Sequence, residues 1–104
     1  MQTNQRPKTC PKKISRYEFD KLCPNRPLLE TFTGELVEWF ANEANTILGA
    51  IDHEPRAETW SYVVISRNQE GALRVVELNE NIVSRPVAET ELFRKMEAAE
   101  TGSG

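Results

Sequence analysis

The alternation of apolar and polar positions is clearest over residues 60–78, where two apolar runs flank the polar segment NQEG. Strands favour β-branched and aromatic residues, and a connection that ends in glycine is typical of a hairpin. In the first arm Tyr62 and Val64 share one face, while Val63 and Ile65 share the other. A strand that is apolar on both faces usually lies inside a sheet or beneath a helix. The pattern therefore predicts a hairpin whose first strand is buried on both sides.

The second arm of the hairpin, residues 72–78, alternates differently. Leu73 and Val75 share one face, whereas Arg74 lies with Val76 on the other. Because a charged side chain interrupts that second face, we expect the fold to cover this strand only in part.

The segments LVEWFA and TILGAID precede this hairpin and are joined by NEAN. A helix over residues 35–48 is the competing interpretation, because Leu36, Phe40 and Ile47 roughly share a helical face. Strands are favoured since two asparagines bracket a tight connection and Gly49 suits a bulge or a close backbone approach. The pattern thus predicts four strands, at 36–41, 46–52, 59–67 and 72–78, which form an antiparallel meander.

A short helix is predicted over residues 15–23. Ser15 and Glu18 have the spacing of a capping box, and Ile14 and Phe19 have that of a hydrophobic staple. The proline that follows ends the helix.

A second helix is predicted over residues 86–99, because Pro86 suits a first helical turn. Its apolar positions form a single stripe, and Glu91 and Lys95 have the spacing of an i to i+4 ion pair. A helix of this kind must cover an apolar surface, and a face of the sheet is the candidate. The predicted fold is α+β, a four-stranded antiparallel β-meander with an N-terminal and a C-terminal helix packed on it.

The chain of 104 residues suits one domain. We expect a disordered basic N-terminal arm at 1–12, the α+β domain at 13–100 and a flexible tail at 101–104. The predicted core consists of Phe19, Leu22, Leu36, Phe40, Leu48, Val63, Ile65, Val75, Leu92 and Met96.

The formal net charge of −3 conceals an uneven distribution. Residues 1–26 carry seven Lys or Arg against two acidic residues, a charge of +5, which leaves −8 for the remainder. A basic arm on an acidic body is typical of a nucleic-acid tether, but also of two halves that attract each other. Lys12, Lys13 and Arg16 are the candidate phosphate contacts if the arm is a tether.

Cys10, Cys23 and the single His53 offer little for metal or disulfide chemistry. Without a secretory segment the thiols are expected to be reduced, although a Cys10–Cys23 bridge stays an alternative. Three distant soft ligands do not make a zinc site, so we expect no metal and no cofactor. No apolar run reaches the roughly 18 residues that span a bilayer, which favours a cytoplasmic protein with no membrane partner.

The cluster Asp52, His53 and Glu54 is the strongest hint of catalysis. We expect it in an exposed loop over residues 52–59, where successive side chains diverge. Nucleophilic catalysis is disfavoured because Cys23 lies at the end of a helix, which raises a thiol pKa, and His53 lies in a separate segment. We therefore predict that the protein is not an enzyme.

The central hairpin resembles that of a family of small uncharacterised bacterial proteins, in which the strand pair reads approximately DWGYVVLGRDxxGxFR. The similarity extends over residues 15–99 and departs from the pattern at Thr59, Ser61, Ser66, Asn68 and Leu73. It implies a shared fold and no particular activity. The matching positions are Trp60, Tyr62, Val63, Val64, Arg67, Gly71 and Arg74.

Two classes of function fit these observations. The first is a small non-enzymatic module that binds another protein, such as an inhibitor or adaptor of the anti-CRISPR type carried by a phage or mobile element. Its candidate contacts are Arg67, Arg74 and Trp60, which lie on or near the hairpin. The second is an accessory nucleic-acid-binding protein that uses Lys12, Lys13 and Arg16. Small size, net acidity and the lack of a catalytic motif favour the first.

Overall fold

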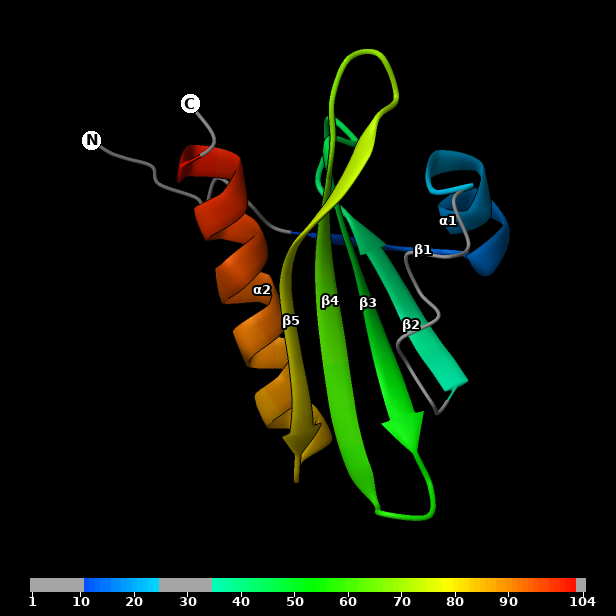
Figure 1. The fold of residues 1–104 in the computed structure, drawn as a ribbon, viewed down its shortest axis with the longest axis vertical. Helices are drawn as coiled ribbons and strands as arrows, with labels where there is room; N and C mark the ends of the chain where they lie inside the picture. Colours follow the sequence, from blue (N-terminus) through cyan, green and yellow to red (C-terminus); the bar gives the residue numbers. More distant parts are fainter. Residues whose placement is uncertain (1–10, 25–34, 103–104) are drawn as a thin grey trace, which may run out of the picture.

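The computed structural model describes residues 11–24 and 35–102, which form one antiparallel sheet with two helices (Figure 1). Strand order follows chain order, so each strand pairs with its neighbours in sequence. Most of the predicted basic arm, together with Cys10 and residues 103–104, lies outside the described residues. The elements are β1 (Lys12–Ile14), α1 (Arg16–Leu22), β2 (Glu35–Ala41), β3 (Ile47–Glu54), β4 (Thr59–Arg67), β5 (Leu73–Ile82) and α2 (Arg85–Gly102).

The prediction of an α+β fold with an antiparallel sheet and two helices is confirmed, but the prediction of four strands is wrong. The fifth strand is β1, which pairs with the end of β2, Ile14 opposite Trp39. β1 has only three residues, two of them lysines, which is too short to show the alternation of apolar and polar positions typical of a strand. The strand exists because β2 offers it backbone partners, which is information that the segment itself does not contain.

Two segments predicted as loops are also strand. β3 continues to Glu54, where His53 pairs with Trp60, so the polar loop begins only at Pro55 and Asp52 is buried. β5 continues to Ile82 through a register shift, with Asn81 at φ 63°. Asparagine tolerates this left-handed conformation, so the polar run that was expected to end the strand forms a bulge within it.

The central hairpin forms as predicted. The Asn68 N–H donates to the Ala72 carbonyl at 3.0 Å, and Gly71 has a φ of 85°. The Asn68 side chain accepts hydrogen bonds from the N–H groups of Glu70 and Ala72 at 2.9 and 2.8 Å. One asparagine thus closes the turn with its backbone and its side chain.

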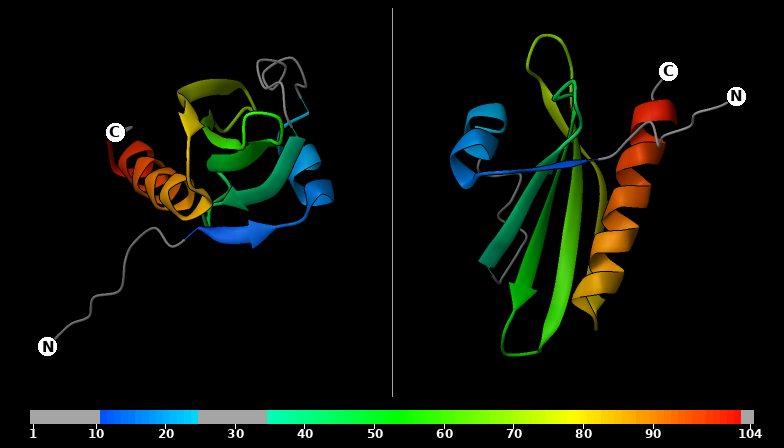
Figure 2. Two further views of the ribbon diagram at one scale, coloured as in Figure 1. Left: turned by 90° about the horizontal axis from the view of Figure 1, so that it is seen from below. Right: turned by 180° about the vertical axis from the view of Figure 1, so that it is seen from behind.

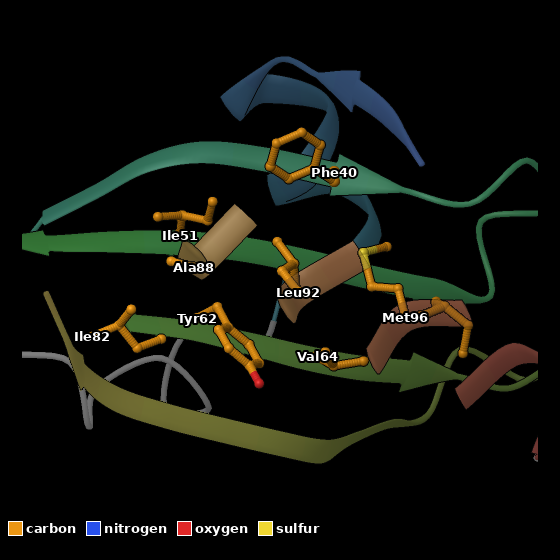
Figure 3. Close-up of a cluster of buried hydrophobic side chains, with 9 residues drawn as sticks. Phe40, Ile51, Tyr62, Val64, Ile82, Ala88, Leu92 and Met96 are labelled. Carbon is orange, nitrogen blue, oxygen red and sulfur yellow. The ribbon is translucent and has the colours of Figure 1, made fainter. Parts of the chain in front are cut away.

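Helix α2 covers one face of the sheet (Figures 1 and 2). Ala88, Leu92 and Met96 on its apolar stripe are fully buried, in one cluster with Tyr62 and Val64 of β4. Figure 3 shows these side chains between the helix and the strands. The stripe predicted from the sequence is therefore the surface that α2 buries.

Helix α1 lies on the opposite face, where Phe19 joins a cluster that contains Val63 and Ile65 (Figure 2). Its capping box is present: the Glu18 N–H donates to Ser15 Oγ at 3.1 Å, and the Ser15 N–H donates to Glu18 Oε1 at 3.2 Å. The box fixes the start of a seven-residue helix that is too short to be stable alone.

Most of the predicted core is buried. Leu22 and Val75 are only partly buried, and the Leu36 side chain lies outside the described residues. The prediction did not include Tyr62 or Ile51, which have no exposed surface. The predicted residues that are buried are Phe19, Phe40, Leu48, Val63, Ile65, Leu92 and Met96.

Gly49 permits the close approach of α2. A Cβ atom at this position would lie 2.7 Å from the Met96 sulfur and 3.0 Å from Leu92 Cδ1. We predict that Gly49→Ala lowers the free energy of unfolding by about 1–3 kcal/mol through overpacking, as measured by urea denaturation. In a Met96→Ala background the same substitution should cost at least about 1 kcal/mol less, because the methyl group then enters vacated space. Equal costs in both backgrounds would contradict this explanation.

Candidate functional site

Three adjoining depressions of about 680, 340 and 280 Å³ follow strand β5 and helix α2. The first two share Ser66 and Arg74, and the second and third share Glu77 and Lys95. Together they form one surface, which we name the β5–α2 groove. Figure 1 shows the two elements side by side, with the hairpin and the C-terminal end of α2 at the same end of the molecule. The polar and apolar residues that line it include Tyr62, Ser66, Arg67, Arg74, Val76, Glu77, Asn79, Glu91, Arg94, Lys95 and Glu100.

Arg67 and Arg74 both line the hairpin end of the groove, and the ladder turns their side chains to opposite faces of the sheet. Arg67 ends β4, and Arg74 lies near the start of β5, opposite Ser66 in the ladder. The Arg67 backbone N–H donates to the Thr46 carbonyl at 2.7 Å, which fixes this end of the strand against the β2–β3 turn. Neither guanidinium forms an ion pair with a described residue. Both are therefore available to a ligand with negative charge.

At the end of the groove away from the hairpin, a hydrogen-bonded group lies on the floor between β4, β5 and α2. Glu91 Oε1 accepts from the Tyr62 hydroxyl at 3.4 Å and from Asn79 Nδ2 at 3.2 Å. Burial raises the pKa of Tyr62, and the nearby charges of Glu91 and Glu77 raise it further. The phenol thus stays protonated and donates to Glu91, which holds the carboxylate toward the sheet.

Lys95 lies beside this group and pairs with Glu77 of β5, at a distance of 3.9 Å. The sequence suggested an ion pair between Lys95 and Glu91 within the helix, but Glu91 is oriented by its two donors on the sheet. A pair this long and this exposed contributes little stability, so Lys95 can change partners at small cost.

The groove concentrates the positive charge of an acidic body. Residues 27–104 carry a formal charge of −8, with only six Lys or Arg: Arg56, Arg67, Arg74, Arg85, Arg94 and Lys95. Four of the six line the groove. The groove also contains Glu77, Glu91 and Glu100, so it is a mixed surface in which cations slightly outnumber carboxylates.

Trp60 is not part of this groove. It lies at the other end of β4, stacked on His53 with ring centroids 4.0 Å apart, and the Arg85 guanidinium lies 5.3 Å from its ring. Of the three residues predicted to contact a protein partner, two therefore line the hairpin end of the groove and the third lies apart from it. The Trp60 ring lies against Arg85, which belongs to a second cluster of charges.

The second cluster is centred on Glu38 of β2, whose side chain is only 9% exposed. It forms ion pairs with Arg85 of α2 and with Lys13 of β1, the latter at 3.4 Å. Burial raises the pKa of Glu38, but hydrogen bonds from Arg85 and Glu89 outweigh burial and lower it below its usual value. Burial and the neighbouring Glu38 raise the pKa of Glu89. These interactions hold the start of α2 to the β1–β2 side of the sheet.

The residues predicted to contact nucleic acid do not converge. Lys12 and Lys13 are adjacent strand residues and point to opposite faces of the sheet. Lys13 pairs with Glu38, and Arg16 pairs with Asp20 within α1, at 3.9 Å. Ion pairing of this kind reduces the positive charge available to phosphates.

The Asp52, His53 and Glu54 cluster also diverges, because the three are successive residues of β3. Within residues 11–24 and 35–102, no group of three His, Cys, Asp or Glu side chains is arranged to hold a metal ion. No helix in the same ranges is long and apolar enough to cross a membrane.

The sequence did not reveal Tyr62, Glu91, Arg94 and Lys95 as parts of one surface. Glu91 and Lys95 flank the apolar stripe of α2 on one side, which a helical projection of the sequence shows, and Arg94 lies further round the helix toward solvent. Which flank faces β5 depends on the direction in which α2 crosses the sheet, and only the folded structure supplies that direction.

No family model, curated protein or solved structure matches this chain. The resemblance to small bacterial proteins therefore stays a prediction.

The paired carboxyls of the second cluster make stability depend on pH. Because the pKa of Glu89 is raised in the folded state, the protonated side chain stabilises the protein. This contribution to the free energy of unfolding is fully present below the unfolded-state pKa and is lost as pH rises through the folded-state pKa. Glu89→Gln should therefore raise the free energy of unfolding at pH 7, by up to about 1 kcal/mol, and have less effect near pH 4.

The contribution of Glu38 has the opposite sign, because its pKa is lowered: it is present above the unfolded pKa and lost as pH falls. Glu38→Gln should destabilise the protein at pH 7 by about 1–3 kcal/mol, since Arg85 loses its buried partner. Urea denaturation at both pH values measures each effect, and Glu43→Gln, in an exposed turn, is the control. A loss of stability in Glu89→Gln at pH 7 would contradict the assignment.

Proposed function

We propose that this protein is a small non-enzymatic module that binds another protein through the β5–α2 groove, as an inhibitor or an adaptor does. The observation that carries the proposal is the gathering of four of the six cations of residues 27–104 in one groove of an acidic body. Arg67 and Arg74 are the principal contacts, because neither has an ion-pair partner among the described residues.

Arginine at such a position suits protein recognition. Its planar guanidinium forms two parallel hydrogen bonds with a carboxylate, and arginine is enriched among the residues that dominate binding energy. Two apolar side chains of β5 are exposed: Val76, which lines the groove with Arg74, is 38% exposed, and Leu78 is 39% exposed. Charged and apolar groups side by side are typical of a protein interface.

Two further observations support a role without catalysis. The single histidine is stacked on Trp60, away from the groove. Cys23 is buried in the cluster on the α1 face of the sheet. His53 and Cys23, the two side chains that the sequence offered as candidates for catalysis, therefore both lie away from the groove.

The proposal predicts that Arg67→Gln together with Arg74→Gln weakens partner binding by more than about 1 kcal/mol, or roughly fivefold in Kd. Affinity capture from the native host would supply the partner, and titration calorimetry with the purified partner would measure the change. Arg56→Gln is the matched control, because Arg56 is an exposed arginine in the β3–β4 loop. Equal affinity of the double variant and the control would refute the proposal.

The alternative, an accessory nucleic-acid-binding protein, makes a different prediction. If Lys12, Lys13 and Arg16 contacted phosphates, affinity would fall steeply with salt, and neutralising all three would reduce the log–log slope by about 2–3. We expect no salt-dependent binding of duplex or single-stranded probes, since Lys13 and Arg16 are in ion pairs. Sub-micromolar binding at about 0.15 M salt would favour the alternative.

A further inference from the structure

We infer that the partner binds by strand addition: an extended segment in which acidic and apolar residues alternate pairs with the outer edge of β5. The inference rests on the proposed function and specifies which part of a partner occupies the β5–α2 groove. Three observations carry it, namely the open edge, the direction of its backbone groups and the chemistry of its two faces.

The edge is long and open. β5 is the last strand of the sheet, has ten residues, and pairs only with β4 among the described residues. An edge strand presents a row of backbone N–H and C=O groups to a segment that lies alongside it, and this is a recurring mode of peptide recognition. At the other edge of the sheet β1 has only three residues, so β5 is the better template.

The direction of the backbone groups follows from the ladder. The Asn68 N–H donates to the Ala72 carbonyl, so residues 68 and 72 form a hydrogen-bonded pair. Such pairs alternate with non-bonded pairs along antiparallel strands, which turns the backbone groups of Leu73 and Val75 away from β4. After the register shift in β5, the same alternation along β4 places those of Leu78, opposite Val63, on the outer side as well.

The two faces of an added strand would meet different chemistry. Toward α2 it would face Arg74, Arg94 and Lys95, which line the groove, so acidic side chains fit there. Toward the α1 face it would lie beside Val75 and Leu78, where apolar side chains fit. Because strand side chains alternate between faces, the matching segment alternates acidic and apolar residues.

A second copy of this chain fits the edge less well. Antiparallel pairing of two β5 strands about a two-fold axis would place Arg94 and Lys95 of both copies on the same face of the joined sheet, where like charges repel.

A single-stranded nucleic acid is also acidic, but it matches the groove poorly. Its phosphates are continuous, whereas Glu77 and Glu91 line the groove together with Arg94 and Lys95. A peptide can place acidic residues opposite the cations and apolar ones elsewhere. It also has the N–H and C=O groups that pair with the strand edge.

The test uses a labelled peptide of alternating Glu and Val, roughly as long as β5, against the full-length protein. Comparison peptides alternate Lys and Val, or replace alternate Val residues by Pro, which removes the donors that a strand needs. We expect fluorescence anisotropy to show at least about tenfold tighter binding of the Glu and Val peptide than of either comparison peptide. Arg74→Gln should weaken that binding several-fold, and Arg56→Gln should leave it unchanged.

Residue-resolved amide exchange by NMR distinguishes strand addition from docking of side chains alone. With the Glu and Val peptide bound, we expect at least about tenfold slower exchange at the outward N–H groups of Leu73, Val75 and Leu78. Leu78→Pro removes one of these donors without removing a bond to β4, and should abolish most of the binding, while Leu78→Ala should not. Circular dichroism checks the fold of both variants. If Leu78→Pro unfolds, amide exchange in the unsubstituted protein still tells whether the peptide adds as a strand.

Several outcomes would overturn the inference. Two concern the peptide: equal affinity for the Glu and Lys peptides, and unchanged exchange at the three amides. Two concern other occupants: an oligonucleotide that binds as tightly as the Glu peptide, and a dimer through β5 in sedimentation. Two results together would remove strand addition but leave the proposed function standing. The first is that the Arg67→Gln and Arg74→Gln double variant loses partner binding. The second is that the unsubstituted protein, with its partner bound, shows unchanged exchange at the three amides.

Discussion

The structure depends on the need to remove both faces of β4 from water. Tyr62 and Val64 on one face, and Val63 and Ile65 on the other, have at most 1% of their surface exposed. A central strand of this kind needs neighbours on both edges and cover on both faces. β3 and β5 supply the edges, α2 covers the first face, and the cluster around α1 covers the second. Replacement of Ile65 by a smaller residue would therefore act on the strand that contributes to both buried clusters.

The position of α2 follows from two polar attachments as well as from its apolar stripe. Near its start, Arg85 pairs with Glu38 of β2, and further along Glu91 accepts hydrogen bonds from Tyr62 and Asn79. The stripe favours contact with the sheet but is tolerant of rotation, whereas hydrogen bonds and ion pairs require particular partners. These attachments fix which flank of the helix lies along β5, and so they determine the residues of the β5–α2 groove.

The charge layout follows from the same arrangement. The body of the protein is strongly acidic, and most of its few cations are separated in sequence, on β4, on β5 and on α2. Folding brings four of them to one groove next to an open strand edge. An acidic body repels acidic partners in general, so a local excess of cations directs such a partner to one place and one orientation. The proposed binding mode uses this contrast between the groove and the rest of the surface.

The sequence by itself determined the elements whose signal is local. The alternation of Tyr62 to Ile65, the capping box at Ser15 and Glu18, and the turn residues Asn68 and Gly71 predicted the hairpin, the first helix and the fold class, because each depends on neighbours within a few positions. Only the tertiary structure decided the rest. The three residues of β1 became a strand because β2 offered partners, Asp52 was buried because β3 continued alongside β4, and Lys95 found Glu77 rather than Glu91. In each case the outcome depended on contacts between segments far apart in the chain, and no pattern within one segment carries that information.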